Sequence, residues 1–288
     1  MRLDSLFKTK KCPFALEVFP PKRTSNVSSV YGTLDQLAKL PVDYISVTYS
    51  AGGNGAKEYT AQIAQYLKDT LQVEPLAHLT CVSSSKTEVQ AALDTLRKTG
   101  IENILALRGD RNPDPAFDNG KDFTHANQLI EEISSYGGFY TAAACYPEGH
   151  PESPSLTSDI QYLQHKLDAG AGHFVSQLFF DNSKFFGFLN LLRKSGIACP
   201  VEAGIMPIVR KEQIQRTVSL SSASLPSGFT KMVSKYSTDP DSFYEAGLEY
   251  SINQIRELIE FGVDGIHLYA MNNPTVATRV YEGIADLL

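Results

Sequence analysis

Short apolar runs alternate along the chain with amphipathic stretches of helical length. Eight of these runs contain or end in residues that can do chemistry, and they lie at residues 14–19, 44–48, 75–80, 103–110, 140–150, 174–181, 201–206 and 265–272. The runs are apolar at nearly every position, which is typical of parallel strands covered on both faces. Eight strand-then-helix units predict an α/β fold of the (β/α)8 TIM barrel type, whose active site gathers residues from the C-terminal ends of the strands.

The amphipathic stretches predict helices at residues 27–39, 56–70, 87–98, 124–135, 158–169, 183–194 and 243–261. Glycine closes four of them, at Gly100, Gly170, Gly196 and Gly262, where a left-handed C-cap would precede the next apolar run. Residues 219–241 are rich in Ser, Pro and Gly. We expect a helix followed by a mobile loop there, of the kind that covers a barrel's site.

A doubly wound open sheet would also alternate strands and helices. Its usual GxGxxG fingerprint is missing, because the first run continues into Pro20 and Pro21 and the GGNGA at 52–56 has the wrong order. The length of 288 residues matches one barrel, so we expect a single domain over residues 1–288.

Charge and cysteine content narrow the class of protein. The net charge is −6 and no block of Lys or Arg occurs, which argues against nucleic-acid or anionic-membrane partners. No secretory signal or apolar run of about 20 residues is evident, so a soluble cytoplasmic protein is expected. Four scattered cysteines, Cys12, Cys81, Cys145 and Cys199, lack CxxC spacing and indicate buried thiols rather than disulfides or a zinc site.

The first run carries a carboxylate, Glu17, immediately before two prolines. Desolvation in an apolar strand favours the neutral, proton-donating form, which suits a general acid near neutral pH. A strand-end pairing with Lys22 or Arg23 is equally consistent with the sequence. The residue type therefore leaves a chemical and a structural interpretation open.

Arg108, Gly109 and Asp110 end the fourth run. Glycine lets backbone amides approach a ligand, arginine supplies a cationic fork, and aspartate supplies a charge that can tune a heteroaromatic ring. A surface ion pair is the alternative interpretation. The position at a predicted strand end favours a binding role.

The segment 146–152 places Tyr146, His150 and two acids in a rigid turn. Together with His78 it could suggest metal ligands, but HxH, HExxH and carboxylate-pair spacings are missing. A polar organic cofactor is the better account. The following helix adds Asp159, His165 and Lys166, which could serve ribose and phosphate groups or form a solvated helix face.

Six motifs occur in one order along residues 14–275. They are FALEVFPPK at 14–22, SVTY at 46–49, HLTC at 78–81, LRGD at 107–110, YPEGHPE at 146–152 and QLFFD at 177–181. This series resembles the methylenetetrahydrofolate reductase family. The resemblance implies a (β/α)8 catalytic domain with non-covalent FAD that reduces 5,10-methylenetetrahydrofolate to 5-methyltetrahydrofolate, in one-carbon metabolism and methionine biosynthesis. It also implies NADH or NADPH as reductant in a ping-pong cycle at one flavin face.

The resemblance assigns roles to matching positions. Glu17 would protonate the folate as its methylene bridge opens, and Asp110 would tune the flavin and help to bind folate. Substrate contacts would come from Thr48, Asp110, Gln177 and Gln213. FAD contacts would come from Tyr49, Ala51, His78, Arg108, Gly109, Asp110, Ala126, Tyr146, His150, Asp159, Tyr162, His165 and Lys166.

Two rival functions remain: a non-redox folate- or corrinoid-handling barrel, and a structural or partner-binding barrel. The first is disfavoured because His78, the 108–110 turn and the 146–150 turn match FAD positions together. The sequence leaves open the choice of NADH or NADPH, homo-oligomer formation and association with a redox partner protein. It favours small-molecule substrates.

Overall fold

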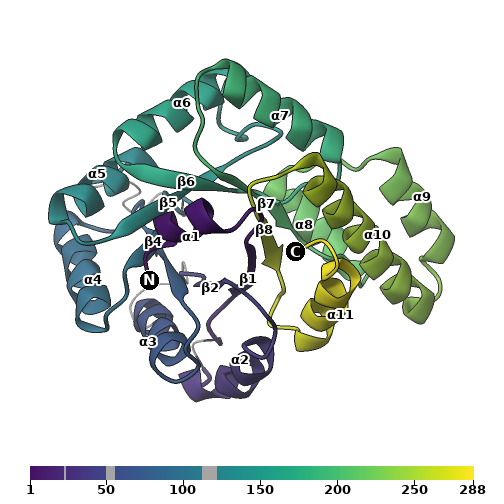
Figure 1. Cartoon of the computed structure of the whole chain (residues 1–288), viewed down its shortest axis with the longest axis horizontal. Coiled ribbons are helices and arrows are strands. Elements are labelled where there is room, and N and C mark those ends of the chain that lie inside the picture. The colour runs from purple at the N-terminus through teal and green to yellow at the C-terminus, as the bar shows by residue number, and fades with distance from the viewer. Residues whose placement is uncertain (23, 50–55, 112–121) are drawn as a thin grey trace.

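A computed structural model describes the chain except for residues 23, 50–55 and 112–121. Eight parallel strands close into a barrel in the order β1 to β8, with helices around the outside (Figure 1). The strands are β1 Phe14–Val18, β2 Tyr44–Val47, β3 Pro75–Thr80, β4 Asn103–Leu107, β5 Tyr140–Cys145, β6 Ala171–Ser176, β7 Val201–Ile205 and β8 Ile266–Tyr269. The predicted (β/α)8 barrel is confirmed.

The helices include those that the sequence predicted, with ends that differ by a few residues. The predicted helix at 27–39 is divided into the 3-10 helix η1 Val27–Val30 and α2 Tyr31–Leu37. The others are α3 Ala56–Asp69, α4 Lys86–Lys98, α5 Ala126–Tyr136, α6 Leu156–Asp168, α7 Asn182–Lys194 and α10 Pro240–Phe261. At the end of α10, Gly262 has φ +90°, the left-handed conformation that the sequence predicted for this cap.

The expectation of a mobile loop within 219–241 is wrong. Helix α8 covers Glu212–Ser221 and a further helix, α9, covers Ser227–Tyr236. Phe229 on α9 is fully buried, stacks on Phe180 with ring centroids 4.6 Å apart, and meets Tyr250 of α10 edge-on. One face of α9 buries these aromatic contacts, and its Ser227, Gly228 and Ser234 are accommodated within the helix.

A short helix that the sequence analysis did not predict, α1 Leu3–Thr9, closes the N-terminal end of the barrel (Figure 1). Leu3 and Leu6 are buried in a cluster with inward-facing strand residues such as Tyr44. The side-chain carbonyl of Asn103 on β4 accepts a hydrogen bond of 2.9 Å from the Leu3 amide. The N-terminal end is therefore a packed plug, and the C-terminal end is left for a pocket. A last unpredicted helix, α11 Pro274–Ile284, packs beside α10.

Alternation along each strand separates two sets of side chains. In β1, Phe14, Leu16 and Val18 belong to the apolar layer beneath the helices, whereas Glu17 belongs to the barrel interior. The interior also carries polar side chains from other strands, among them Ser46, His78, His173, Glu202 and His267. Such a polar interior differs from the branched apolar filling usual in these barrels.

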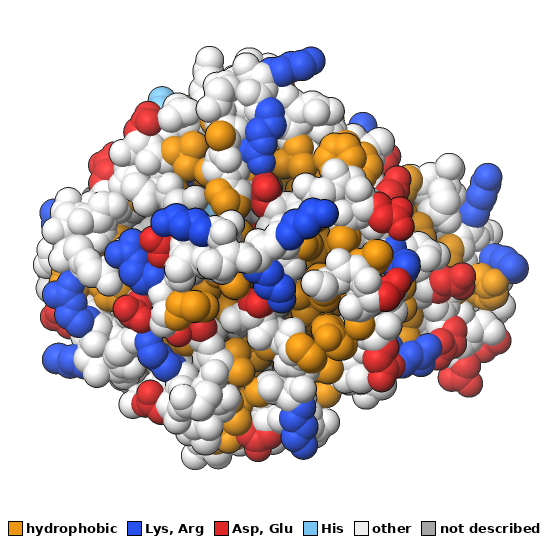
Figure 2. Space-filling view, viewed as in Figure 1, with side chains coloured by type: hydrophobic (Ala, Val, Ile, Leu, Met, Phe, Trp, Pro, Cys, Tyr) orange, Lys and Arg blue, Asp and Glu red, His pale blue; other side chains and the backbone are white. Residues whose placement is uncertain are grey.

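The face that carries α1 has Lys and Arg side chains interspersed with Asp, Glu and apolar groups (Figure 2). Within the described part of the chain, no helix is both long and apolar enough to cross a membrane. All four cysteines are free; Cys12, Cys81 and Cys145 are buried and Cys199 is half-buried.

Candidate active site

A pocket of about 780 Å³ is lined by residues at the C-terminal ends of the strands and by the adjoining loops and helices. Most residues that the sequence singled out line this pocket: Glu17, Thr48, Tyr49, His78, Arg108, Gly109, Asp110, Ala126, Tyr146, His150, Asp159, Tyr162, His165, Lys166 and Gln177. Ala51 lies outside the described residues. Gln213 is described but is not part of the lining.

Glu17 lies in the floor of the pocket. The strand register places it beside Ser46 of β2 and Tyr269 of β8. Its Oε2 atom is 3.5 Å from Nε2 of His78 and 3.5 Å from Nε2 of His267. The Glu17 side chain is 20% exposed, so it is sheltered by the barrel yet open to a ligand. Lys22, one of its suggested partners, is exposed, and Arg23 lies outside the described residues.

The turn at 108–110 requires glycine at its centre. Gly109 has φ +86°, and a Cβ there would come within 3.0 Å of the Thr80 Cβ. The carbonyl of Arg108 accepts hydrogen bonds from the Cys81 and Val82 amides, which ties this turn to the end of β3. Asp110 then lies exposed at the pocket.

Arg108 makes a two-pronged ion pair with Glu152, with N–O distances of 2.7 and 2.8 Å. The Glu152 hydrogen bonds raise the pKa of Arg108, and the guanidinium lowers the pKa of Glu152. The ion pair foreseen as the alternative for Arg108 therefore exists. It lies in the pocket lining, because both residues line it, and it joins β4 to the 146–152 turn.

The 146–152 turn is fixed to the first turn of α6. Ser155 caps α6, and the buried Asp159 accepts a hydrogen bond of 2.9 Å from the His150 amide. The His150 ring packs edge-on against Tyr146 with centroids 4.7 Å apart. Burial raises the pKa of Tyr146 to about 12, so its hydroxyl keeps its proton and can donate a hydrogen bond.

Two basic side chains in the lining are desolvated. Burial lowers the pKa of His78 to about 4, and within the described structure its Nε2 makes no hydrogen bond. Burial also lowers the pKa of Lys166, whose amine donates to the Ala144 carbonyl at 2.7 Å. A buried imidazole nitrogen without a hydrogen-bond partner and a desolvated amine in the same lining are suited to a polar ligand that fills the pocket.

The predicted substrate residues occupy different surroundings. Thr48 and Gln177 line the pocket, and the Gln177 backbone amide is held by the Cys145 carbonyl at 2.7 Å. Gln213 instead lies in the first turn of α8. Its side-chain carbonyl accepts hydrogen bonds from the amides of Val209 and Arg210 at 3.0 and 2.8 Å. The structure therefore does not bring Gln213 into the lining with the others.

Sequence reasoning missed several residues of the site, including Tyr269 in the lining and His267 behind Glu17. The Tyr269 hydroxyl donates to the Ser176 carbonyl at 2.6 Å, which joins β8 to β6. A signal was present: His267 and Tyr269 are two residues apart in an otherwise apolar strand and therefore point to the same side. That period of two in polar side chains could have placed both in the barrel interior.

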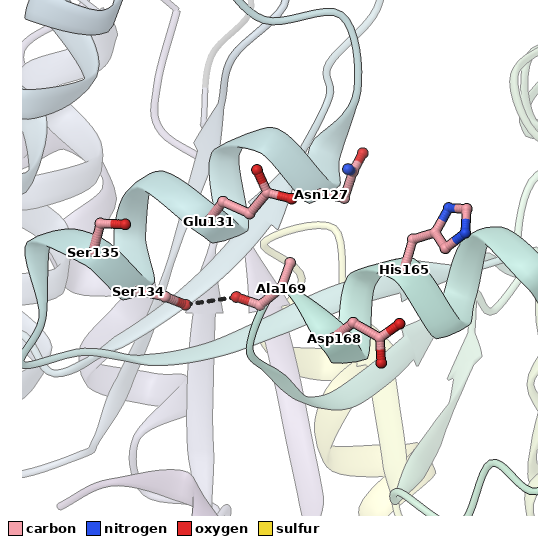
Figure 3. Close-up of a pocket in the computed structure, with 7 residues that line it drawn as sticks. All are labelled: Asn127, Glu131, Ser134, Ser135, His165, Asp168 and Ala169. Carbon is pink, nitrogen blue, oxygen red and sulfur yellow. Dashed lines mark hydrogen bonds between the residues drawn. The ribbon is translucent and has the colours of Figure 1, made fainter.

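A shallower hollow of about 380 Å³ lies between α5 and α6 (Figure 3). It is lined by Asn127, Glu131, Ser134, Ser135, His165, Asp168 and Ala169. Ser134 donates to the Ala169 carbonyl at 2.7 Å, which closes one end. Asn127 and His165 also line the main pocket, so the hollow continues it outward along the two helices.

A family model of methylenetetrahydrofolate reductase matches residues 2–285. The chain belongs to this family. A relative from Arabidopsis thaliana, methylenetetrahydrofolate reductase (NADH) 1, is 31% identical over 94% of this chain and 48% of its own length. The 5,10-methylenetetrahydrofolate reductase of Pectobacterium carotovorum is 30% identical over 92% of this chain and 88% of its own length. The chain thus spans about half the length of the plant relative and most of the bacterial one.

Among solved structures, a protein from Clostridium thermocellum that binds two copies of 5-methyl-5,6,7,8-tetrahydrofolic acid has a TM-score of 0.70. It covers 100% of this chain and 99% of its own, at 11% sequence identity. At that identity the similarity is one of fold. The specific link to the methylenetetrahydrofolate reductase family comes from the sequence match.

Proposed function

We propose that this chain is an FAD-dependent enzyme that reduces 5,10-methylenetetrahydrofolate to 5-methyltetrahydrofolate, with NADH or NADPH as reductant. The observation that carries the proposal is the gathering of Glu17, Asp110 and the 146–150 turn around one pocket in a member of this family. We further propose a cytoplasmic enzyme whose two substrates use the pocket in turn.

The pocket residues fit a flavin dinucleotide. Such a cofactor is large, anionic at its pyrophosphate and rich in hydrogen-bonding ring atoms. The lining offers it cationic groups at Arg108 and Lys166, and a buried His78 nitrogen that lacks a hydrogen bond in the described structure. Residues proposed to hold FAD are Tyr49, Ala51, His78, Arg108, Gly109, Asp110, Ala126, Tyr146, His150, Asp159, Tyr162, His165 and Lys166. When bound, FAD would supply the hydride relay between nicotinamide and folate.

Glu17 would supply the proton for the folate half-reaction. A proton donated from its carboxyl group to a folate nitrogen lets the methylene bridge open to the iminium that accepts hydride. Its Oε2 atom lies 3.5 Å from the rings of both His78 and His267, and its side chain is open to the pocket, where a folate nitrogen can approach it. Reduction by a nicotinamide needs no such proton, so Glu17 would serve one half-reaction.

Asp110, Thr48 and Gln177 are proposed to orient the substrates. Asp110 places a carboxylate at the exposed edge of the pocket, where it can interact with both the ring system of the cofactor and the pterin. Thr48 and Gln177 supply polar groups from β2 and β6. A substrate contact from Gln213 requires its amide to leave the Val209 and Arg210 backbone amides that it now binds.

The decisive experiment follows flavin colour under anaerobic conditions. Protein loaded with FAD should bleach on addition of NADH or NADPH, and methylenetetrahydrofolate added next should restore the oxidised spectrum. Bleaching without recovery by folate would refute the folate half-reaction. A chain that binds folate but gains no flavin with excess FAD would favour the non-redox folate-handling alternative.

A further inference from the structure

A line of polar side chains continues from Glu17 into the barrel, below the pocket lining. His267 of β8, Tyr44 of β2 and Glu202 of β7 are all 0% exposed. They lie between the pocket and the α1 plug, since Tyr44 packs in the same cluster as Leu3 and Leu6. A buried carboxylate in this position needs a structural reason, because desolvation penalises its charge unless hydrogen bonds compensate.

The hydrogen bonds fix where the protons lie. The Tyr44 hydroxyl donates to Oε2 of Glu202 in a short contact. Burial and the adjacent Glu202 raise the pKa of Tyr44 well above its ordinary value, so the phenol keeps its proton. A phenol has one proton, and Tyr44 uses it on Glu202. Its oxygen can then only accept from Nδ1 of His267, which lies 3.2 Å away.

The other nitrogen of His267 faces the pocket side. With the hydrogen on Nδ1, a neutral imidazole presents a lone pair at Nε2. That nitrogen accepts a hydrogen bond of 3.0 Å from the Ser46 hydroxyl, and it lies 3.5 Å from Oε2 of Glu17, to which it offers no hydrogen. A lone pair in this position stabilises a protonated Glu17 and repels its carboxylate form.

Other titratable groups surround this line of residues. His78 of β3 faces Glu17 from the opposite side at 3.5 Å, and the Tyr269 ring of β8 packs edge-on against His267. Behind Glu202, Nε2 of His173 on β6 lies 3.4 Å from Oε2, and Nδ1 of His173 is 3.0 Å from the Tyr140 hydroxyl. Glu202 is therefore approached from β2 and β6 as well as from β8.

We propose that Glu202 is a positioning residue that, through Tyr44, holds His267 with its Nε2 lone pair toward Glu17 and so keeps Glu17 protonated for proton donation. The proposal rests on the proposed role of Glu17 in folate reduction. Glu202 itself touches no substrate in this scheme. It acts through the chain of hydrogen bonds that Tyr44 and His267 form.

The first test uses the wild-type protein and requires no activity measurement. In protein labelled with ¹⁵N at its six histidines, NMR shifts of the two ring nitrogens report which one carries hydrogen. We expect His267 to be neutral and protonated at Nδ1 at pH 7. A neutral ring protonated at Nε2, or a doubly protonated ring, would overturn the proposal.

The second test is Glu202→Gln, a change that removes the charge while keeping the size of the side chain. The amide can donate to the Tyr44 oxygen, which frees the phenol proton for Nδ1 and moves the imidazole hydrogen to Nε2. Glu17 then loses its proton more easily. The pH above which flavin reoxidation by methylenetetrahydrofolate slows should move toward acid by about one pH unit or more, while flavin reduction by NADH keeps its pH profile. An unshifted reoxidation profile with an unchanged His267 spectrum would overturn the proposal.

A matched pair of variants separates positioning from general damage to the barrel. Tyr44→Phe and Tyr140→Phe each remove one hydroxyl from a buried tyrosine of the same cluster, but only Tyr44 contacts His267. Tyr44→Phe should shift the His267 spectrum and the reoxidation profile, and Tyr140→Phe should leave both unchanged. Equal effects would overturn the proposal. If the loaded wild type fails to reduce folate, the proposed function fails, and the His267 spectra still decide the position of the proton.

Discussion

The same strands line the two ends of the barrel interior with different kinds of side chains. Toward their N-terminal ends, β1, β3 and β5 contribute Ala15, Leu76 and Ala142, which pack under Leu3 and Leu6 of α1. Toward their C-terminal ends these strands contribute Glu17, His78 and Ala144 to an open pocket. A shift of one pleat, two residues along a strand, separates an apolar plug from a polar site.

The α1 plug lies beneath a layer of polar side chains that borders the pocket. Glu202, His173 and His267 are fully buried between the two ends. Hydrogen bonds strengthen in such low-dielectric surroundings, and unpaired polar groups become costly. The α1 plug excludes water from below, so the protons in this layer are set by neighbouring side chains. Stability is therefore expected to depend on the lower end and reactivity on the upper end.

Glu17→Gln should give the largest effect, and it acts at the upper end. The amide cannot donate an acidic proton, so folate reduction should fall by about 100-fold or more, whereas flavin reduction by NADH should continue near its wild-type rate. Stopped-flow absorbance of the flavin measures the two half-reactions separately. Glu260→Gln, the same change at an exposed position on α10, is the control and should alter neither rate.

Equal losses in the two half-reactions of Glu17→Gln would show that Glu17 supports the pocket rather than donates a proton. The assignment of Glu17 to the chemistry of the upper end would then fail. Urea unfolding of the same variant distinguishes these outcomes. A catalytic role leaves the unfolding midpoint close to that of the wild type.

Leu3→Ala changes the lower end, and it should reduce stability rather than the rate of either half-reaction. Leu3 is fully buried, and truncation of such a leucine costs about 2–4 kcal/mol of unfolding free energy. Urea unfolding measures this loss. Leu225→Ala, at a leucine that is 36% exposed, should change stability by about 0.5 kcal/mol or less. If folded Leu3→Ala protein shows slow flavin reduction by NADH, then the lower end affects reactivity as well as stability, contrary to this prediction.

Much of the upper end was predictable because barrel strands deliver their C-terminal residues to one place. Glu17 lies near the end of β1, and the 108–110 and 146–150 turns follow β4 and β5, so the predicted barrel was enough to bring them together. Gln213 lies outside this lining, and its side chain binds two backbone amides in the turn before α8. Such local hydrogen bonds depend on turn geometry that residue type alone does not reveal.

The lower end was not predictable to the same degree. Helix α1 has only seven residues, so its periodicity is weak, and its stability comes from Leu3 and Leu6 entering the barrel. The contact of Tyr44 with Glu202 joins residues 158 positions apart. It depends on barrel closure and strand register, which no local pattern encodes.

His78 should make the stability of the folded protein depend on pH. Its pKa is lowered by burial from an ordinary 6.5 to about 4. Below pH 6.5 the unfolded chain takes up a proton that the folded protein does not bind until about pH 4. Stability from this residue is therefore complete above pH 6.5 and is lost as pH falls toward 4. Between pH 7 and 5 the wild type should lose roughly 1–2 kcal/mol more than His78→Gln.

Urea unfolding at several pH values measures that difference. His165→Gln serves as the control, because His165 is exposed at the pocket rim and should follow the wild type. If His78→Gln loses as much stability on acidification as the wild type, His78 is accessible to protons in the folded state. The upper layer of the interior would then be wetter than its burial indicates.

Asp110→Asn should give the smallest effect, because Asp110 is exposed and water screens its charge. A negative charge beside the flavin disfavours its anionic reduced form, so removing it should raise the flavin midpoint potential. Loss of the same charge should weaken folate binding. Each change should correspond to about 1 kcal/mol or less, the range of exposed charge interactions. Potentiometric titration and folate titration of the variant beside the wild type measure them.

The control is Asp168→Asn, which removes the same charge from the hollow between α5 and α6 rather than from the main pocket. It should leave both the midpoint potential and the folate affinity unchanged. An unchanged or lowered midpoint with intact folate affinity in Asp110→Asn would place this carboxylate outside the flavin and pterin contacts, and the functional part of the upper end would then be confined to the deeper residues around Glu17.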